Sequence, residues 1–369
     1  MKKYKIENLC TVRSSKRIFA NQYTNEGIPF YRGKEITLLS LGQKISDLLY
    51  INDKAYDDIK INGVPKENDI LITAVGTIGS VWLIDHNAPF YFKDGNIIWL
   101  SSINADIALP KYLKYLLTSS AFQRKIEEIS IGSNQKALTI DALKKQEIDV
   151  PTLNIQQHIV DILGTLDDKI ENLEEINSKL QNYCIAKYRL LFSDVEHIPL
   201  SNIAAITMGQ SPAGNTLNDE DGVVFYQGRT DFGFRYPTVR LFTTDPKRMA
   251  KAGDILLSVR APVGDVNIAA EDCCIGRGIA AVSSEYNSFV YYSILNQKTD
   301  FDIYNNSGTI FGSINRDALS AFKIPAANIS LIETFESMAS DVDKSIHNNT
   351  KEIDKLRTLK QTYLQKFFG

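Results

Sequence analysis

Two glycine-rich stretches are the parts of this chain whose residue types best suit ligand binding. They are Gly76-Thr77-Ile78-Gly79-Ser80 and Arg260-Ala261-Pro262-Val263-Gly264. The backbone amides of such loops can approach phosphate groups closely. Either loop alone is explained equally well as an ordinary hairpin turn. The presence of a similar loop in each half of the chain favours binding.

Long polar side chains near these loops could read nucleic-acid bases. Arginine can bond guanine through two parallel hydrogen bonds, and asparagine or glutamine can do the same with adenine. The candidates of the first half are Arg32, Lys34, Gly76, Thr77, Gly79, Asn134, Gln135 and Lys136. The candidates of the second half are Gln227, Arg229, Arg235, Arg260, Gly264, Arg277 and Arg316. The arginines of the second set favour a target with G·C pairs in that half.

Catalytic groups are scarce. Gly27 and Gly33-Lys34 lack the spacing of a nucleotide-phosphate loop, and Glu35 stands where Ser or Thr is required. No Asn-Pro-Pro-Tyr-like run is present, with which a DNA amino-methyltransferase would hold its target base. Asp167-Asp168-Lys169 lies within a helical repeat, where a solvated helix face explains it better than a nuclease site. We therefore predict a non-catalytic chain without a metal or cofactor of its own.

Composition leaves the choice of partner open. The 369 residues suit two domains with connectors, and the formal net charge of −3 neither supports nor excludes nucleic acid. We expect the four cysteines to be buried free thiols in a reducing compartment, because adjacent Cys273 and Cys274 lack zinc-ligand spacing. No signal peptide or membrane-length apolar run is evident, so a cytoplasmic location is expected.

Two long helical repeats must position the two halves. Steps of four and three residues connect core positions that run from Ile159 to Leu191, and the same steps recur 176 residues later, from Phe335 to Phe367. This heptad spacing predicts a coiled coil. About 37 helical residues at ~1.5 Å each would give a rod of roughly 55 Å, which could hold two binding surfaces at a fixed separation.

Two asparagines on the predicted seam indicate how these helices pair. Asn177 and Asn349 each occupy a core position. If they face each other, the helices run antiparallel, facing residues have numbers that add up to 526, and the neighbouring layers are apolar. A parallel alignment would bury each amide against an aliphatic side chain, at a cost of about 1–3 kcal/mol each. The sequence therefore predicts an intramolecular antiparallel coiled coil.

The segments before the helices are duplicated. Phe225-Tyr226-Gln227-Gly228-Arg229 matches Phe30-Tyr31-Arg32-Gly33-Lys34, and Asp254-Ile255-Leu256 matches Asp69-Ile70-Leu71. Other matched marks include Asp317-Ala318-Leu319 with Asp141-Ala142-Leu143. The loops between these marks diverge. A shared scaffold with different surfaces suits two sites that do one job on different targets, although duplication for stability alone remains an alternative.

The whole arrangement resembles the specificity subunit of type I restriction–modification enzymes. The resemblance rests on the order domain, long helix, domain, long helix, on Ile155-Gln156-Gln157 and Leu166-Asp167-Asp168-Lys169-Ile170 in the first helix, and on the proline-ended strands Asp149-Val150-Pro151 and Lys323-Ile324-Pro325. It implies an α+β fold with two similar mixed-sheet target-recognition domains separated by two long helices. One departure is Leu331-Ile332-Glu333, which replaces Ile155-Gln156-Gln157 in the second helix.

The same resemblance implies a division of labour. Residues 1–151 and 194–325 would each read one half of a bipartite double-stranded DNA target. The helices at 152–193 and 326–369 would set the spacer and dock two methyltransferase subunits, which would hold S-adenosylmethionine. Separate restriction (motor) subunits would use ATP and Mg²⁺. Three alternatives stay open: a helical-rod adaptor without DNA specificity, a nuclease with a cryptic site, and a specificity subunit that has lost its target.

Overall fold

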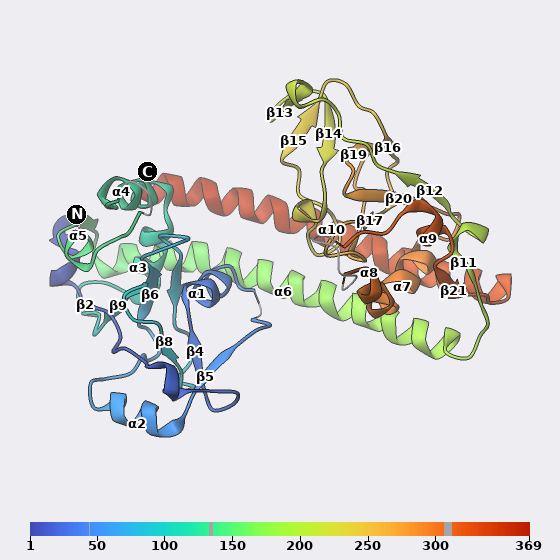
Figure 1. Ribbon diagram of the computed structural model, residues 1–369. Coiled ribbons are helices and arrows are strands. Elements are labelled where there is room, and N and C mark those ends of the chain that lie inside the picture. Colours follow the sequence, from blue (N-terminus) through green and yellow to red (C-terminus); the bar gives the residue numbers. More distant parts are fainter. Residues whose placement is uncertain (44, 133–135, 306–311) are drawn as a thin grey trace. The chain divides into compact units, whose positions relative to one another are not determined.

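The computed structural model describes residues 1–43, 45–132, 136–305 and 312–369. These residues form two compact units, which are treated separately below. Unit 1 comprises Met1–Asn172 with Ile353–Gly369, and unit 2 comprises Leu173–Glu352. Two 40-residue helices, α6 (Leu153–Phe192) and α10 (Ile329–Phe368), contribute a segment to each unit and are green and red in Figure 1. The α+β class expected from the sequence is confirmed.

Unit 1 contains three sheets. The strands β1 (Lys2–Lys5) and β10 (Glu147–Val150) form an antiparallel pair. One four-stranded sheet has the order β2 (Thr11–Arg13), β9 (Ile97–Ser101), β6 (Ile70–Thr73) and β7 (Val81–Leu83). The other has the order β3 (Tyr23–Thr24), β5 (Leu49–Ile51), β4 (Ile28–Tyr31) and β8 (Tyr91–Phe92), in which β4 and β8 are parallel. Its short helices are α1 (Gly33–Ser40), α2 (Asp53–Lys60), α3 (Pro110–Thr118), α4 (Ser120–Ile129) and α5 (Ile140–Lys144).

Unit 2 repeats this plan. The pair β11 (His197–Pro199) and β21 (Lys323–Pro325) corresponds to β1 and β10. One sheet has the order β12 (Ala205–Met208), β20 (Ile279–Ser283), β17 (Ile255–Ser258) and β18 (Val266–Ile268). The other has the order β13 (Leu217–Asn218), β15 (Leu241–Thr243), β14 (Val223–Tyr226), β19 (Cys273–Ile275) and β16 (Met249–Ala250). Its short helices are α7 (Asn287–Asn296), α8 (Asp302–Asn305) and α9 (Arg316–Ser320).

The internal repeat is confirmed at the level of strand pairing. In unit 1, Phe30 lies opposite Tyr91 in a parallel pair, and in unit 2 Phe225 lies opposite Cys274 in the same way. The central strands β6 and β17 are buried at all four positions. Their side chains alternate between two apolar clusters on opposite faces, which explains why each strand reads as an unbroken apolar run.

One predicted helix is divided in the structure. The apolar spacing of Leu113, Leu116, Leu117 and Phe122 predicts a single helix that begins at Pro110, but α3 ends at Thr118 and α4 begins at Ser120. Ser119 has extended backbone angles, and its hydroxyl accepts a hydrogen bond from the amide of Phe122 at 3.3 Å. Because serine competes well for this capping position, it starts a new helix instead of continuing the first.

The long helices pack antiparallel in each unit. In unit 2, Asn349 Nδ2 donates to Asn177 Oδ1 at 2.8 Å, which is the contact that the alignment of seam positions predicts. In unit 1, Lys360 pairs with Asp167 at 2.5 Å, and Leu163 shares an apolar cluster with Leu364. Residues later in α6 thus contact residues earlier in α10, as expected for antiparallel helices. A small departure is that Leu364 is buried, while the predicted seam residue Tyr363 is only partly buried.

Candidate nucleic-acid interface

The candidates of unit 1 converge at the start of α1 and the loop between β6 and β7. The hydroxyls of Thr37 on α1 and Ser80 after the loop lie 3.1 Å apart. A backbone bond from Leu138 N to Ala74 O, 2.9 Å long, brings the segment that follows Lys136 to the same loop. We call this surface rim 1 and define it by its members: Arg32, Lys34, Gly76, Thr77 and Lys136. Asn134 and Gln135 lie outside the described residues.

The two glycines of the first loop have different roles. Gly76 is exposed with φ +79°, and an added Cβ would meet open space. Gly79 is buried with φ +86°, and an added Cβ would lie 2.5 Å from Gln123 Oε1. Gly264 in unit 2 resembles Gly79, because a Cβ there would lie 2.7 Å from the ring of Phe301. Gly79 and Gly264 therefore permit close packing, and Gly76 is the glycine with an accessible backbone.

Arg32 is held in a fixed orientation by Glu35, whose side chain is fully buried. Arg32 donates from Nε and Nη2 to the two carboxylate oxygens at 3.1 and 2.7 Å, and its backbone amide donates at 2.7 Å. Burial acts to raise the pKa of Glu35, but the hydrogen bonds from Arg32 outweigh it, so the pKa lies below its usual value. The carboxylate is thus charged at neutral pH.

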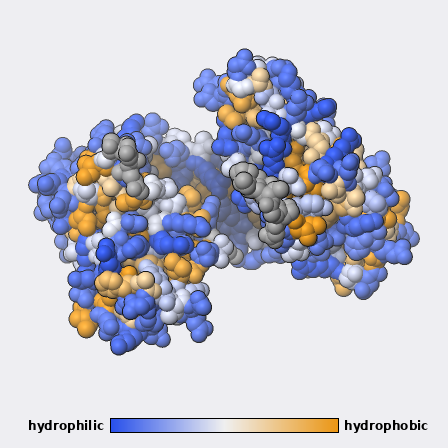
Figure 2. Space-filling model, in the orientation of Figure 1, coloured by the Kyte–Doolittle hydropathy of each residue, from blue (hydrophilic) through white to orange (hydrophobic). Residues whose placement is uncertain are grey.

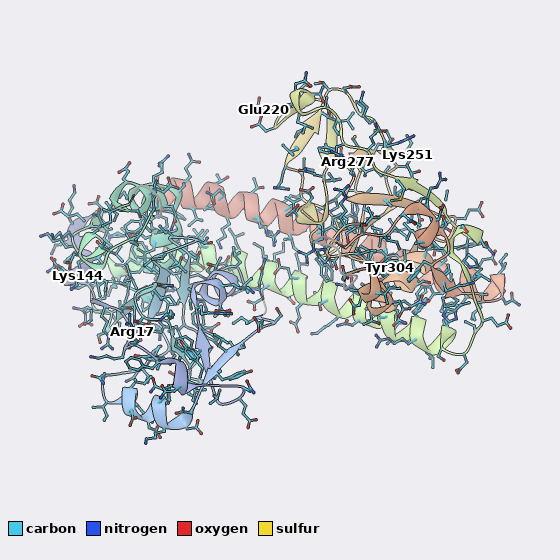
Figure 3. All side chains as sticks on the ribbon, viewed as in Figure 1. Arg17, Lys144, Glu220, Lys251, Arg277 and Tyr304 are labelled. Atoms are coloured by element: carbon cyan, nitrogen blue, oxygen red, sulfur yellow. The ribbon has the colours of Figure 1, made fainter. Side chains whose placement is uncertain are left out.

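The candidates of unit 2 converge at the corresponding place. The side chains of Arg229 and Lys298 both bond Asp265, which follows the β17–β18 loop, at 2.6 and 2.5 Å. Gly276 N donates to Tyr226 O at 2.8 Å, which brings the β19–β20 turn with Arg277, labelled in Figure 3, beside Gln227. We call this surface rim 2 and define it by its members: Gln227, Arg229, Arg240, Arg260, Arg277 and Lys298.

Two members of rim 2 were missed by sequence reasoning. Arg240 precedes β15 and donates from Nε at 2.8 Å, and from Nη2, to Asp231. Lys298 comes from Lys298–Phe301, a 3₁₀ helix far along the chain. Neither residue lies in a motif, and only the pairing of β14 with β15 and the fold around Asp265 bring them to this surface. Burial acts to raise the pKa of Asp265, but Lys298 and Arg229 bring it below its usual value.

The structure corrects one candidate, Arg235. Its side chain is fully buried, and its guanidinium bonds Asp343 on α10 and the hydroxyl of Tyr292 at 2.6 Å. The same guanidinium lies 4.0 Å from the centroid of the Tyr291 ring. Arg235 is therefore bonded within the protein and cannot reach DNA from this position. Arg316 is exposed at the start of α9, which packs against β12.

The described part of the chain offers little for catalysis. Within it, no group of three or more His, Cys, Asp or Glu side chains is placed to hold a metal ion. All four cysteines are buried free thiols, as expected. No described helix is long and apolar enough to cross a membrane. Hydrophilic residues cover much of both units on the face shown in Figure 2. The described residues thus form two similar folds, each with exposed cations on its rim.

Comparison with known proteins identifies the family. The family model described as type I restriction modification DNA specificity domain matches residues 1–182 and 193–354. The proposed MjaX type I restriction enzyme specificity subunit of Methanocaldococcus jannaschii is 30% identical over 363 residues, which cover 87% of this chain and 85% of that protein. The MjaIX specificity subunit of the same organism is 30% identical over 146 residues, which cover 40% of this chain and 32% of that protein.

A solved structure agrees on the fold. The type I restriction–modification S subunit from M. genitalium matches with a TM-score of 0.60 at 20% identity, and the match covers 100% of this chain and 96% of that one. The chain belongs to the family of type I restriction–modification DNA specificity subunits. Members of this family are the non-catalytic, DNA-recognising components of their complexes.

Proposed function

We propose that this chain reads a bipartite double-stranded DNA target. Residues 1–151 would read one half through rim 1, and residues 194–325 would read the other through rim 2. The observation that carries the proposal is that each of two similar folds has exposed cations near the ends of its strands, with Lys34 and Arg229 at matching positions and the other cations at different ones. Such cations can bond phosphates and base edges, and family membership makes DNA the expected ligand.

The helices at 152–193 and 326–369 would set the unread gap and dock other subunits. The antiparallel contacts Asn177–Asn349 and Asp167–Lys360 support a stiff coil. We further propose two methyltransferase subunits as direct partners, with restriction subunits joining the assembly. S-adenosylmethionine, ATP and Mg²⁺ would then be held by the partners. Cytoplasmic DNA is the expected target.

Selection from a library of random duplex DNA tests the recognition step. The chain, with and without its methyltransferase partner, should enrich two short defined sequences separated by a gap of constant length. Enrichment of no sequence would favour a helical-rod adaptor. Metal-dependent cleavage of DNA by the purified chain would favour a nuclease. Either result would overturn the proposal.

A paired deletion tests the spacer role. Removing residues 168–181 together with 345–358 takes two heptads from each helix. The deletion removes the Asn177–Asn349 layer, and it keeps Asp167 opposite Lys360 and the remaining apolar layers in register. The coil shortens by about 21 Å, so the gap should shrink by at most about six base pairs while both half-sites stay the same. Deleting only 168–181 is the matched control, because it misaligns the seam. A change in either half-site would contradict the spacer role.

A further inference from the structure

A buried carboxylate holds an exposed arginine at the equivalent place in each unit. In unit 1 the pair is Glu35, whose side chain is 0% exposed, and Arg32, whose side chain is 37% exposed. In unit 2 it is Asp231, 3% exposed, and Arg240, 51% exposed. Both arginines use Nε and Nη2 to bond the carboxylate. The same edge of each guanidinium is used, but Arg32 bonds both oxygens of Glu35, whereas both nitrogens of Arg240 bond the single oxygen Oδ1 of Asp231.

The carboxylates bond equivalent backbone amides, although they are one residue apart in the aligned repeat, and the arginines come from different places. Glu35 accepts a bond from the amide of Arg32 at 2.7 Å, and Asp231 accepts one from the amide of Gln227 at 2.8 Å. Arg32 follows β4, which pairs in parallel with β8, and Gln227 follows β14, which pairs in parallel with β19. The arginine of unit 1, Arg32, is itself the residue after this strand, whereas Arg240 immediately precedes β15. Both units thus have an arginine bonded to a buried carboxylate beside this strand end, but the arginine comes from a different place in the repeat.

The free side of each guanidinium faces away from the carboxylate. A guanidinium is planar and carries five N–H bonds. The bonds to the carboxylate take the edge formed by Nε and Nη2, so the edge formed by Nη1 and the second hydrogen of Nη2 points in another direction. Asp47 approaches Arg32 Nη2 only to 3.9 Å, beyond hydrogen-bonding range. This second edge has the spacing that bonds O6 and N7 of guanine.

Arg235 shows what a purely structural arginine looks like in this protein. Its side chain is 0% exposed, and its guanidinium is enclosed by Asp343, Tyr291 and Tyr292. If Arg32 and Arg240 served only to neutralise Glu35 and Asp231, they could be buried as Arg235 is. Instead, both arginines keep part of the side chain in solvent. Fixing that part before binding reduces the entropy lost when a base is bound.

We propose that Arg32 and Arg240 read guanine in the major groove, one in each half-site, and that Glu35 and Asp231 are positioning residues. This inference rests on the proposed DNA-reading function. Arg229 and Lys298 share the one carboxylate of Asp265, so neither guanidinium nor ammonium is held by a carboxylate of its own, and these cations suit phosphates. A G·C pair is therefore expected in both half-sites, not only in the second.

The test uses the chain with its methyltransferase partner and the sequence that this complex selects from random duplexes. Each guanine is replaced in turn by 7-deazaguanine, which lacks the N7 acceptor. One replacement in the second half-site should weaken wild-type binding by roughly 5- to 150-fold. The variant Arg240→Ala should bind the normal and the replaced duplex equally, and Arg240→Lys, which lacks the planar fork, should recover at most part of the difference. Arg32→Ala should behave in the same way at one guanine of the first half-site.

Controls separate reading from folding. Each variant should keep its discrimination in the half-site of the other unit, which shows that the complex is intact. Lys251→Ala, which removes an exposed cation of unit 2 paired with Asp272, should leave every discrimination unchanged. Asp231→Asn keeps all positive charges but loses the charged fork, and it should weaken discrimination at the same guanine as Arg240→Ala.

Two results would overturn the inference. If Arg240→Ala weakens all sequences equally and lowers the salt dependence while Arg240→Lys restores it, the side chain contacts a phosphate. If neither variant alters DNA binding, the arginine only neutralises Asp231. Failure of the proposed function looks different, because the wild-type complex would then select no sequence at all.

Discussion

The Asn177–Asn349 hydrogen bond provides a quantitative test of the coiled coil. Asn177 is 2% exposed, and its side-chain oxygen accepts from Asn349 Nδ2 at 2.8 Å. Replacing either residue alone by leucine leaves the other amide facing an apolar side chain. An unpaired buried polar group costs about 1–3 kcal/mol. The double variant Asn177→Leu with Asn349→Leu removes both amides and creates one more apolar layer.

The expected result is a coupling energy in a double-mutant cycle. The double variant should be at least as stable as the wild type, and therefore more stable than the sum of the two single variants predicts by about 2–6 kcal/mol. Urea unfolding followed by circular dichroism at helical wavelengths measures the midpoint shifts. The matched control combines Asn177→Leu with leucine at exposed Asn348. That control pair should be additive within a few tenths of a kcal/mol.

Two outcomes would refute this reasoning. Additive effects of the Asn177 and Asn349 replacements would mean that the two amides do not share one layer. A double variant that is less stable than both single variants would mean that this layer does not accept apolar packing. The first outcome would contradict the antiparallel register in which facing residue numbers add up to 526, and the second would contradict the expected gain from apolar packing.

Three further predictions concern stability and chemistry. Burial raises the pKa of Cys10 and of Cys273 to about 12, so both thiols should react only slowly with a disulfide reagent in the native protein, and four thiols should react after unfolding. Arg235→Met leaves Asp343 without its cation and should destabilise unit 2 by about 3–5 kcal/mol, seen as faster hydrogen exchange in α7; unchanged exchange would contradict the role of this pair. The folded pKa of Glu35 lies below its unfolded value, so its contribution is complete above about pH 4.3 and is lost as the pH falls through the folded pKa. Glu35→Gln should therefore flatten the acid limb of the stability profile, and an unchanged limb would contradict this assignment.

Much of the scaffold could be predicted because its signals are periodic and local. The heptad steps fixed both long helices, and a single pair of seam asparagines indicated their direction. The matched strand marks located β4 with β14 and β6 with β17, and β6 and β17 are buried at all four positions in both units. The break at Ser119 escaped prediction, since the apolar spacing alone continues across it.

The candidate site was less predictable, because it depends on which polar side chains fold inward. Arg235 and Arg240 are five residues apart in one loop, and nothing in their local sequence distinguishes them. The tertiary structure brings Arg235 against α10 and leaves Arg240 on the surface beside Asp231. Gly79 and Gly264 likewise have roles that depend on the neighbours Gln123 and Phe301, which come from distant segments.

The central claim is that two similar units read two halves of one DNA target. Genome-wide mapping of N6-methyladenine, in cells that express this chain with its methyltransferase partner, tests the claim most directly. The account predicts a methylated motif made of two short defined sequences separated by a gap of constant length. Exchanging residues 194–325 for those of another specificity subunit should change one half of the motif only. A continuous motif, or methylation without any motif, would contradict the account.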